Sequence, residues 1–343
     1  MKQPTRHALP ASASGSAWGK VILLGEHSVV YGRRALASAI SRQVEVQVTD
    51  LYSAALHENG RNGAEDLLAA DPRFRAAVVR AAELLELDAG DLRIHVESNL
   101  PAGVGLGSSA AVSVALVRAL AAYAGAECCQ AEVCAHAYEL ERIFHGTPSG
   151  IDNAAATHGG LFVFRRGEPP LQLGVPRPLP LVVAVGKTPR QTQRAVAGVR
   201  ERWQAQRAVY EAIFDAIDAL VGVAGAALAG GDLIGAGSAM NENHELLRRI
   251  GVSTEELDEL VRVAREGGAL GAKLTGGGGG GAVICLCETL DAAELLARRC
   301  ARSGWDAFTT SITSALPAAR VAPQRNPVGR AAAAAERRVA VNR

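Results

Sequence analysis

Residues Pro101–Leu120, with the sequence PAGVGLGSSAAVSVALVRAL, join a glycine loop to the start of a helix. A proline and three alternating glycines, Gly103, Gly105 and Gly107, lead through two serines into small and aliphatic residues at helical spacing. The first turn of a helix has backbone N–H groups without intrahelical partners, and glycines let an anion approach them closely. With the alternating strand pattern Leu92–Ser98 ahead of it, the loop predicts a phosphate site. The alternative is a turn that only permits tight strand-to-helix packing, because short glycine patterns are weak motifs.

A second candidate site follows a short apolar run, Lys20–Leu24, which lies between Gly19 and Gly25 and predicts a buried strand. Glu26 and His27 come directly after it, so that a carboxylate stands beside an imidazole in a turn. An ordinary surface turn is the alternative. The position directly after a buried strand that begins with a lysine favours a functional site.

Two further carboxylates stand out near the middle of the chain. Glu141 lies in a predicted helix over residues 132–144, in an apolar background, and Asp152 ends a loop rich in Pro, Ser and Gly. Asp152 before Asn153 and three alanines also fits a helix N-cap, so a functional role for it needs partners elsewhere in the chain.

Six consecutive glycines, Gly276–Gly281, follow Lys273-Leu274-Thr275 and precede a strand pattern at Ala282–Cys287. Glycine loses more conformational freedom on folding than any other residue, so an ordered run of this kind implies a backbone wrapped closely around a ligand or a neighbouring segment. A flexible linker is the alternative, and the regular patterns close to both ends of the run weaken it.

Taken together, the four stretches indicate a magnesium nucleotide and a hydroxyl acceptor. The common nucleotide motifs do not account for them. The sequence has no GxxxxGK[ST], no HRD and DFG pair of protein kinases and no GxSxG elbow. The loop from Gly103 to Ser109 reads GVGLGSS, which is not the GxGxxG of a dinucleotide fold.

Composition excludes several classes of function. The chain has 343 residues, with 36 Lys plus Arg against 35 Asp plus Glu, and its net charge of +1 offers no general attraction for nucleic acid or anionic lipid. The six cysteines show no CxxC pairing, which argues against a zinc ribbon and for a reducing compartment. We found no apolar leader and no apolar run of membrane-spanning length, so a cytoplasmic location without membrane or nucleic-acid partners is expected.

The pattern along the chain predicts two domains with a boundary in the proline-rich segment 169–180. The expected organisation is a mobile N-terminal extension over residues 1–16, an ATP-binding domain over 17–175, a second domain over 176–316 and a disordered tail over 317–343. Strand and helix patterns occur in both domains, and several helices follow one another in the second. For the assembly, a homodimer is considered.

The same residues resemble the GHMP family of small-molecule kinases. Three motifs match in order: GKVILLGEHSVVYG at 19–32, PAGVGLGSSAA at 101–111 and KLTGGGGGG at 273–281. The first motif, together with ERIFHGTPSGIDN at 141–153, is most similar to the mevalonate kinase branch of that family. The resemblance spans residues 17–312 and implies an α+β fold of two domains with the active site in the cleft between them.

The resemblance also implies roles for individual residues. Asp152 matches the catalytic aspartate that accepts the proton of the substrate hydroxyl, and Lys20 matches the lysine that pairs with it. Ser109 and Glu141 match positions that hold Mg²⁺, a cation that requires hard oxygen ligands. The acceptor implied is mevalonate, with ATP as co-substrate. The ATP-binding set is Pro101, Gly103, Gly105, Leu106, Gly107, Ser108, Ser109, Gly277 and Gly278, and the substrate-binding set is Glu26, His27, Arg190 and Thr192.

Within the substrate-binding set, His27 and Arg190, together with Lys20, are the candidates to neutralise the mevalonate carboxylate, and Thr192 matches a threonine near the transferred phosphate. Gly277 stands where the family usually has alanine, a change expected to loosen the loop without removing a contact. Two alternatives remain: another acceptor alcohol, such as phosphomevalonate or a sugar, and a non-catalytic ligand sensor on the same scaffold. Because a sensor has no need of a base, Lys20 and Asp152 together argue against the second.

Overall fold

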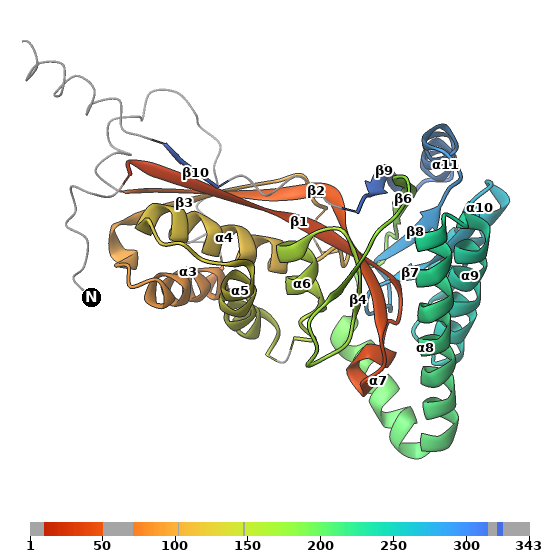
Figure 1. The fold of residues 1–343 in the computed structure, drawn as a ribbon. Coiled ribbons are helices and arrows are strands. Elements are labelled where there is room, and N and C mark those ends of the chain that lie inside the picture. The colour runs from red at the N-terminus through yellow and green to blue at the C-terminus, as the bar shows by residue number, and fades with distance from the viewer. Residues whose placement is uncertain (1–9, 51–70, 102, 147, 315–320, 325–343) are drawn as a thin grey trace, which may run out of the picture.

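The computed structural model describes residues 10–50, 71–101, 103–146, 148–314 and 321–324. The described strands form one sheet of six strands and one of four (Figure 1). The first sheet has the order β10-β1-β2-β4-β5, with β3 also paired to β2, and all of its pairs are antiparallel. Its strands are β1 (Ser12–Leu24), β2 (Ala35–Asp50), β3 (Leu92–Ser98), β4 (Leu161–Phe164), β5 (Leu171–Leu173) and β10 (Val321–Gln324).

Four helices gather on one side of the first sheet (Figure 1): α3 (Pro72–Leu84), α4 (Ser108–Ala124), α5 (Gln130–His145) and α6 (Ile151–His158). Helix α4 packs against both β1 and β2 and is apolar on nearly every side, as expected for a helix enclosed by a sheet and by other helices. Gly15 permits this close packing, because a Cβ atom at that position would lie 2.5 Å from the carbonyl oxygen of Ala115 in α4.

The second sheet has the order β7-β8-β6-β9 and is also antiparallel. Its strands are β6 (Leu179–Val185), β7 (Gly271–Thr275), β8 (Ala282–Leu286) and β9 (Asp306–Ile312). Helices α9 (Leu233–Arg249), α10 (Glu255–Glu266) and α11 (Leu290–Arg302) pack on this sheet, while α7 (Thr192–Ala205) leads into α8 (Arg207–Gly230), which lies along α9.

Helix α8 is long and apolar enough, by length and composition alone, to cross a membrane, contrary to the sequence prediction that no such run exists. Its buried side chains include Phe214, Ile217 and Val221, and it packs against α9. The helix is apolar because one of its faces is buried in the hydrophobic core that covers the second sheet.

The two sheets touch where β2 meets β9 and where β1 meets β7. The hydroxyl groups of Ser41 and Thr310 lie 2.9 Å apart at the first contact. At the second, the Thr275 hydroxyl accepts a hydrogen bond from the Ile22 amide at 3.0 Å and donates one to the Ile22 carbonyl at 3.1 Å. The chain crosses from the first sheet to the second between Leu173 and Leu179, inside the proline-rich segment.

Both predicted terminal segments contain ordered structure. Strand β1 begins at Ser12, so residues 12–16 belong to the first sheet and not to a mobile extension. Residues 321–324, within the predicted disordered tail, form β10 and pair with β1 from Ser12 to Gly15. The missed signal is weak, because small residues such as those of 12–16 favour a strand only when a partner strand and a covering helix are supplied by the rest of the fold. The remaining parts of the two predicted segments, residues 1–9, 317–320 and 325–343, lie outside the described residues.

Candidate active site

Lys20 and Asp152 face each other between the first strand and a short helix. The Lys20 ammonium in β1 lies 3.1 Å from an Asp152 carboxylate oxygen, and the two side chains are 4% and 32% exposed. Asp152 is not the N-cap of α6, because Gly150 is the cap residue and the helix begins at Ile151. The Asp152 carboxylate therefore has no capping role. It is partly exposed and is held by the buried Lys20 ammonium group.

The first glycine loop runs beside this pair and ends in the N-terminus of α4. Gly103, Gly105 and Gly107 all have positive φ, and Gly107 caps α4 without a side-chain hydrogen bond to its first turn. A Cβ atom on Gly107 would lie 2.7 Å from Cγ of Lys20, so glycine is required at that position. The Lys20 amide donates to the Leu106 carbonyl at 2.9 Å, which fixes the loop next to the strand that carries Lys20.

Backbone N–H groups at the start of α4 and the positive end of its dipole form the kind of anion site that the sequence predicts. Ser108 and Ser109 are the first two residues of the helix. Leu106 is buried and anchors the loop in the core, whereas Pro101 is half-buried at the entrance to it. The predicted ATP-binding residues of this loop thus lie together.

Glu141 in α5 is buried below the first turn of α4, where two serines bond its carboxylate. The Ser109 hydroxyl donates to it at 3.1 Å and the Ser113 hydroxyl at 3.2 Å. Burial, with a smaller contribution from the negative charge of Asp152, raises the pKa of Glu141 to about 7. A cation held between these carboxylates would favour the charged form of both.

His145 completes this cluster and was not singled out from the sequence. Its Nε2 lies 3.0 Å from Oγ of Ser109 and 3.6 Å from the Glu141 carboxylate. Burial lowers the pKa of the His145 imidazole. The spacing could have revealed it, because residues four apart on a helix lie on the same face.

The second glycine loop faces the first across the junction of the two sheets. Added Cβ atoms on Gly276 and Gly281 would lie 3.8 Å from the Gly105 carbonyl oxygen and 3.2 Å from the Val104 carbonyl oxygen. Gly278 approaches the core even more closely, since a Cβ there would lie 2.2 Å from the carbonyl oxygen of Val252. The run of glycines is therefore a packed loop and not a linker.

Glu26 lies deeper than a substrate-contacting residue is expected to lie. It is 1% exposed, and its carboxylate pairs with the fully buried ammonium group of Lys273 in β7. The Asn243 amide in α9 donates to the other carboxylate oxygen at 3.3 Å. Lys273 also donates to the Leu274 carbonyl at 2.6 Å. Glu26 thus joins the first strand of the chain to the second sheet.

His27 lies against the second glycine loop. A carbonyl oxygen can only accept, so the contact of 3.0 Å between His27 Nε2 and the Gly277 oxygen places the ring proton on Nε2. Burial lowers the pKa of His27 to about 4, which makes the imidazole neutral near pH 7. His27 therefore brings no positive charge to a substrate carboxylate at that pH, in contrast to the sequence prediction.

Arg190 and Thr192 approach the two loops from the segment that enters α7. A Cβ atom on Gly105 would lie 3.4 Å from an Arg190 guanidinium nitrogen, so the arginine lies over the first loop. The Thr192 hydroxyl is buried and has no hydrogen-bond partner among the described residues. Both side chains therefore lie against the glycine loops.

Gly277→Ala is expected to lower kcat/KM by about tenfold, because overpacking costs about 1–3 kcal/mol. A Cβ atom at this position would lie 2.5 Å from Cγ2 and 3.0 Å from Oγ1 of Thr192, so the threonine must move. The sequence prediction that the glycine only loosens the loop omitted this contact. Steady-state kinetics of the variant provides the measurement.

Two further variants control that measurement. Adding Thr192→Ser to Gly277→Ala removes the obstructing methyl group and should restore most of the lost activity. Gly174→Ala, where the added methyl group meets open space and φ is not positive, should leave kcat/KM unchanged. A Gly277→Ala enzyme as active as the wild type would show that the loop and Thr192 move apart freely.

Comparisons with known proteins agree with this architecture. Two family models match: "GHMP kinases N terminal domain" over residues 76–160 and "GHMP kinases C terminal" over residues 223–306. A protein named mevalonate kinase from Pyrococcus horikoshii is 36% identical over 298 residues, which cover 79% of this chain and 87% of that protein. One of the same name from Methanothermobacter thermautotrophicus is 37% identical over 286 residues, covering 80% and 90%.

Solved structures extend the likeness to the fold. The crystal structure of L. major mevalonate kinase in complex with R-mevalonate has a TM-score of 0.77 and 30% identity, covering 88% of this chain and 95% of that one. Lactococcus lactis galactokinase complexed with galactose shares the fold at a TM-score of 0.69 and 16% identity, covering 91% and 95%. The predicted α+β fold and the predicted resemblance are both confirmed. Since the chain aligns with named relatives along most of its length and folds as they do, this protein belongs to the GHMP kinase family.

Proposed function

We propose that this protein is a mevalonate kinase, which transfers the γ-phosphate of ATP to the 5-hydroxyl of mevalonate in the supply of isoprenoid precursors. The observation that carries the proposal is the Lys20–Asp152 pair, 3.1 Å apart, directly beside the glycine loop at the start of α4. Relatives of that name at 36% and 37% identity support the choice of acceptor.

The two glycine loops are proposed to hold the nucleotide. The phosphates would lie against the backbone N–H groups of Gly103–Ser109, with Gly277 and Gly278 on the opposite side and the Arg190 charge nearby. Phosphoryl transfer needs little covalent help from the protein, so positioning and electrostatic stabilisation supply most of the rate. Residues from both sheets must meet for this arrangement to form.

Asp152 is proposed to take the proton from the acceptor hydroxyl as that oxygen bonds to the γ-phosphorus. The bond from this phosphorus to the bridging oxygen then breaks, and ADP leaves with its electron pair. Lys20 orients the Asp152 carboxylate and adds positive charge beside the transferred group. Thr192, with its unpartnered hydroxyl, is proposed to bond to the transferred phosphate.

Ser109 and Glu141 are proposed to hold Mg²⁺ together with the nucleotide phosphates. They fit this role, since a serine hydroxyl and a buried carboxylate with a raised pKa lie next to a second carboxylate, Asp152. No group of three His, Cys, Asp or Glu that could hold a metal occurs in the described part of the chain. Mg²⁺ bound through one or two carboxylates and substrate phosphates does not require one. When bound, the ion would neutralise negative charge on the phosphates.

At the acceptor end, Arg190 is the better candidate to neutralise the mevalonate carboxylate. Lys20 is already paired with Asp152, and His27 is neutral near pH 7. His27 would instead offer its second ring nitrogen as a hydrogen-bond acceptor, because Nε2 bonds to Gly277. Glu26 is proposed to act on the acceptor indirectly, through the position of His27.

Incubation of the protein with mevalonate and MgATP, followed by identification of the product, tests the function. We expect 5-phosphomevalonate and ADP in equal amounts. A panel containing phosphomevalonate, galactose and homoserine serves as the comparison. Turnover of another alcohol without turnover of mevalonate would overturn the acceptor, and absence of turnover with every alcohol, despite ATP binding, would favour a sensor.

The domain ranges 17–175 and 176–316, the cytoplasmic location and the homodimer stay predictions. The crossing between the sheets at residues 173–179 supports the proposed boundary.

A further inference from the structure

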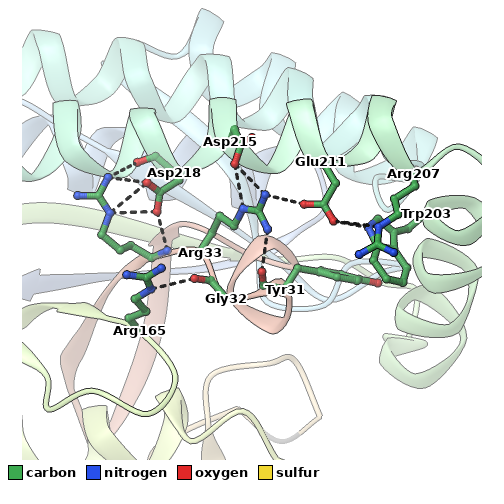
Figure 2. A network of polar contacts seen from close by, with 10 residues as sticks. Tyr31, Gly32, Arg33, Arg165, Trp203, Arg207, Glu211, Asp215 and Asp218 are labelled. Atoms are coloured by element: carbon green, nitrogen blue, oxygen red, sulfur yellow. Dashed lines mark hydrogen bonds and ion pairs between the residues drawn. The ribbon is translucent and has the colours of Figure 1, made fainter.

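The turn that carries Glu26 and His27 continues into a short helix that packs against helix α8. Two consecutive arginines, Arg33 and Arg34, follow the short helix η2 (Ser28–Tyr31) and pair with three carboxylates of α8. Figure 2 shows the three carboxylates on one face of the helix, with Arg33 against two of them. These carboxylates belong to Glu211, Asp215 and Asp218. Steps of four and three residues place them on one stripe of the helix.

The Arg34–Asp218 contact is a bidentate ion pair with an added backbone hydrogen bond, and such an ion pair between an arginine of the turn and α8 is called a joint here. The Arg34 guanidinium donates to the two carboxylate oxygens at 3.0 and 2.6 Å, and the Arg34 backbone amide donates to the same carboxylate at 2.7 Å. The Arg34 guanidinium also donates to the Asp218 backbone carbonyl at 3.2 Å. The pKa of Asp218 is lowered, mainly by these hydrogen bonds. Bidentate pairs of this kind fix orientation as well as distance.

Arg33 makes a second joint one residue earlier. Its guanidinium bonds to Asp215 at 2.8 Å and to Glu211 at 2.5 Å, and it donates to the Tyr31 carbonyl at 2.9 Å. The arginine therefore ties α8 directly to the backbone of η2. The guanidinium groups of both arginines are occupied by these carboxylates, so the cluster acts as a joint and not as an anion site.

An aromatic contact lies between the ion pairs and the core. The Tyr31 ring stacks on Phe214 of α8, with centroids 4.5 Å apart and planes at 19°, and packs against Trp203 of α7 at 5.1 Å. The Trp203 indole donates to Glu211 at 2.9 Å, which connects the rings to the charged network. Arg165, which follows β4, donates to the Gly32 carbonyl at 2.9 Å.

Backbone hydrogen bonds within the turn connect the arginines to Glu26 and His27. Within residues 25–33, the Val29 amide bonds to the Gly25 carbonyl at 3.2 Å, the Val30 amide to the His27 carbonyl at 3.0 Å and the Arg33 amide to the Ser28 carbonyl at 3.2 Å. His27 has a φ of 61°, an unusual conformation for a residue other than glycine, so its surroundings must hold it there. The joints on α8 lie at one end of this turn, and Glu26 and His27 lie at the other.

We propose that Arg33 and Arg34, docked on Glu211, Asp215 and Asp218 of α8, are positioning residues that hold His27 in place for the acceptor alcohol. They touch no reacting group themselves. The inference rests on the proposed function only for the identity of the acceptor, because the position of the turn can be measured without a substrate.

Kinetics of Arg34→Ala, Asp218→Asn and the double variant Arg34→Ala/Asp218→Asn tests the proposal. We expect KM for the acceptor to rise about fivefold, equivalent to about 1 kcal/mol, with kcat and KM for ATP within about twofold. The double variant should be no worse than the more impaired single variant, since both changes open the same joint. Arg34→Lys, which keeps the charge but loses the bidentate contact, should lie between Arg34→Ala and the wild type.

The matched control is Arg262→Ala. Arg262 pairs with Glu259 and Glu266 on its own helix α10, so this variant removes a surface arginine and its ion pairs without touching the joint. It should leave both KM values unchanged.

Hydrogen exchange of the amides in residues 25–34 gives a readout that needs no turnover. Exchange should be faster in Arg34→Ala and Asp218→Asn than in the wild type and in Arg262→Ala. An unchanged acceptor KM and unchanged exchange in both Arg34→Ala and Asp218→Asn would overturn the proposal, as would additive effects in the double variant.

If Arg34→Ala does not fold, the results for Arg34→Lys and Asp218→Asn decide the proposal. If the wild type phosphorylates another alcohol, KM is measured for that one, so failure of the acceptor assignment and failure of the joint stay distinguishable.

Discussion

Asp152→Ala is expected to lower kcat by about 10²–10⁴-fold while ATP binds with nearly unchanged affinity. The carboxylate is 32% exposed and is held 3.1 Å from the Lys20 ammonium, so it is open to the acceptor and already oriented. Among the described residues, the hydrogen bonds of the loop at Gly103–Ser109 go to partners other than Asp152, which is why ATP binding should survive. Steady-state kinetics and calorimetric titration with ATP analogues provide the two measurements.

A matched control exists on another helix. Asp291 occupies the first turn of α11 as Asp152 occupies the first turn of α6, so Asp291→Ala removes a carboxylate from the start of a helix that packs on β6 and β9. It should leave kcat unchanged. Asp152→Asn, which keeps the size of the side chain, should lose about as much activity as Asp152→Ala, because charge and proton acceptance are what the step uses. A kcat for Asp152→Ala within a few-fold of the wild type would refute the role of this residue.

Sequence patterns were most informative where a residue and its structural context are close together in the chain. Gly103–Ser109 could be interpreted as an anion site because the strand, loop and helix patterns are all local. Glu141 and Asp152 were found by their chemical type, and the resemblance connected them with Lys20 and Ser109. The pairing of Lys20 with Asp152 is present in the structure as the resemblance implied.

The sequence could not predict contacts between residues far apart in the chain. Lys273 and Glu26 are separated by 247 positions, and no periodicity in either segment indicates that one is the counterion of the other. A lysine in the middle of a fully buried strand, GAKLT, was the available signal, because an unpaired ammonium group is almost never buried. The same holds for Asp218, which looks like an ordinary exposed residue of an amphipathic helix until Arg34 is placed against it.

Lys273→Met is expected to destabilise the protein by about 3–5 kcal/mol, since it leaves the buried Glu26 carboxylate without its counter-charge. Both side chains are at most 1% exposed, so water cannot replace the lost partner. Glu26→Gln should cost a similar amount near pH 7. The double variant Glu26→Gln/Lys273→Met removes both charges and should recover most of the loss. Urea unfolding monitored by circular dichroism measures the three free energies.

The pH dependence distinguishes this explanation from a loss of packing. Burial already lowers the pKa of Lys273 from 10.5, and the Glu26 charge opposes that shift. In Glu26→Gln the opposition is gone, so the folded state binds fewer protons than the unfolded state from the lowered pKa up to about 10.5, and stability rises with pH over that window. The deficit of Glu26→Gln relative to the wild type should therefore shrink between pH 7 and pH 9.5. A deficit that is constant with pH would contradict a buried, uncompensated ammonium group.

Activity of the double variant then separates the two roles of Glu26. If Glu26 contacts the acceptor directly, the acceptor KM should rise strongly in both variants that lack it, Glu26→Gln and the double variant, while Lys273→Met, which keeps the carboxylate, retains a KM near that of the wild type. If Glu26 acts by fixing the turn against β7, all three variants should raise the acceptor KM, because each breaks the connection that holds His27 against the Gly277 carbonyl. We expect the second pattern, since the Glu26 carboxylate is already occupied by Lys273 and Asn243 and has almost no exposed surface left for a substrate.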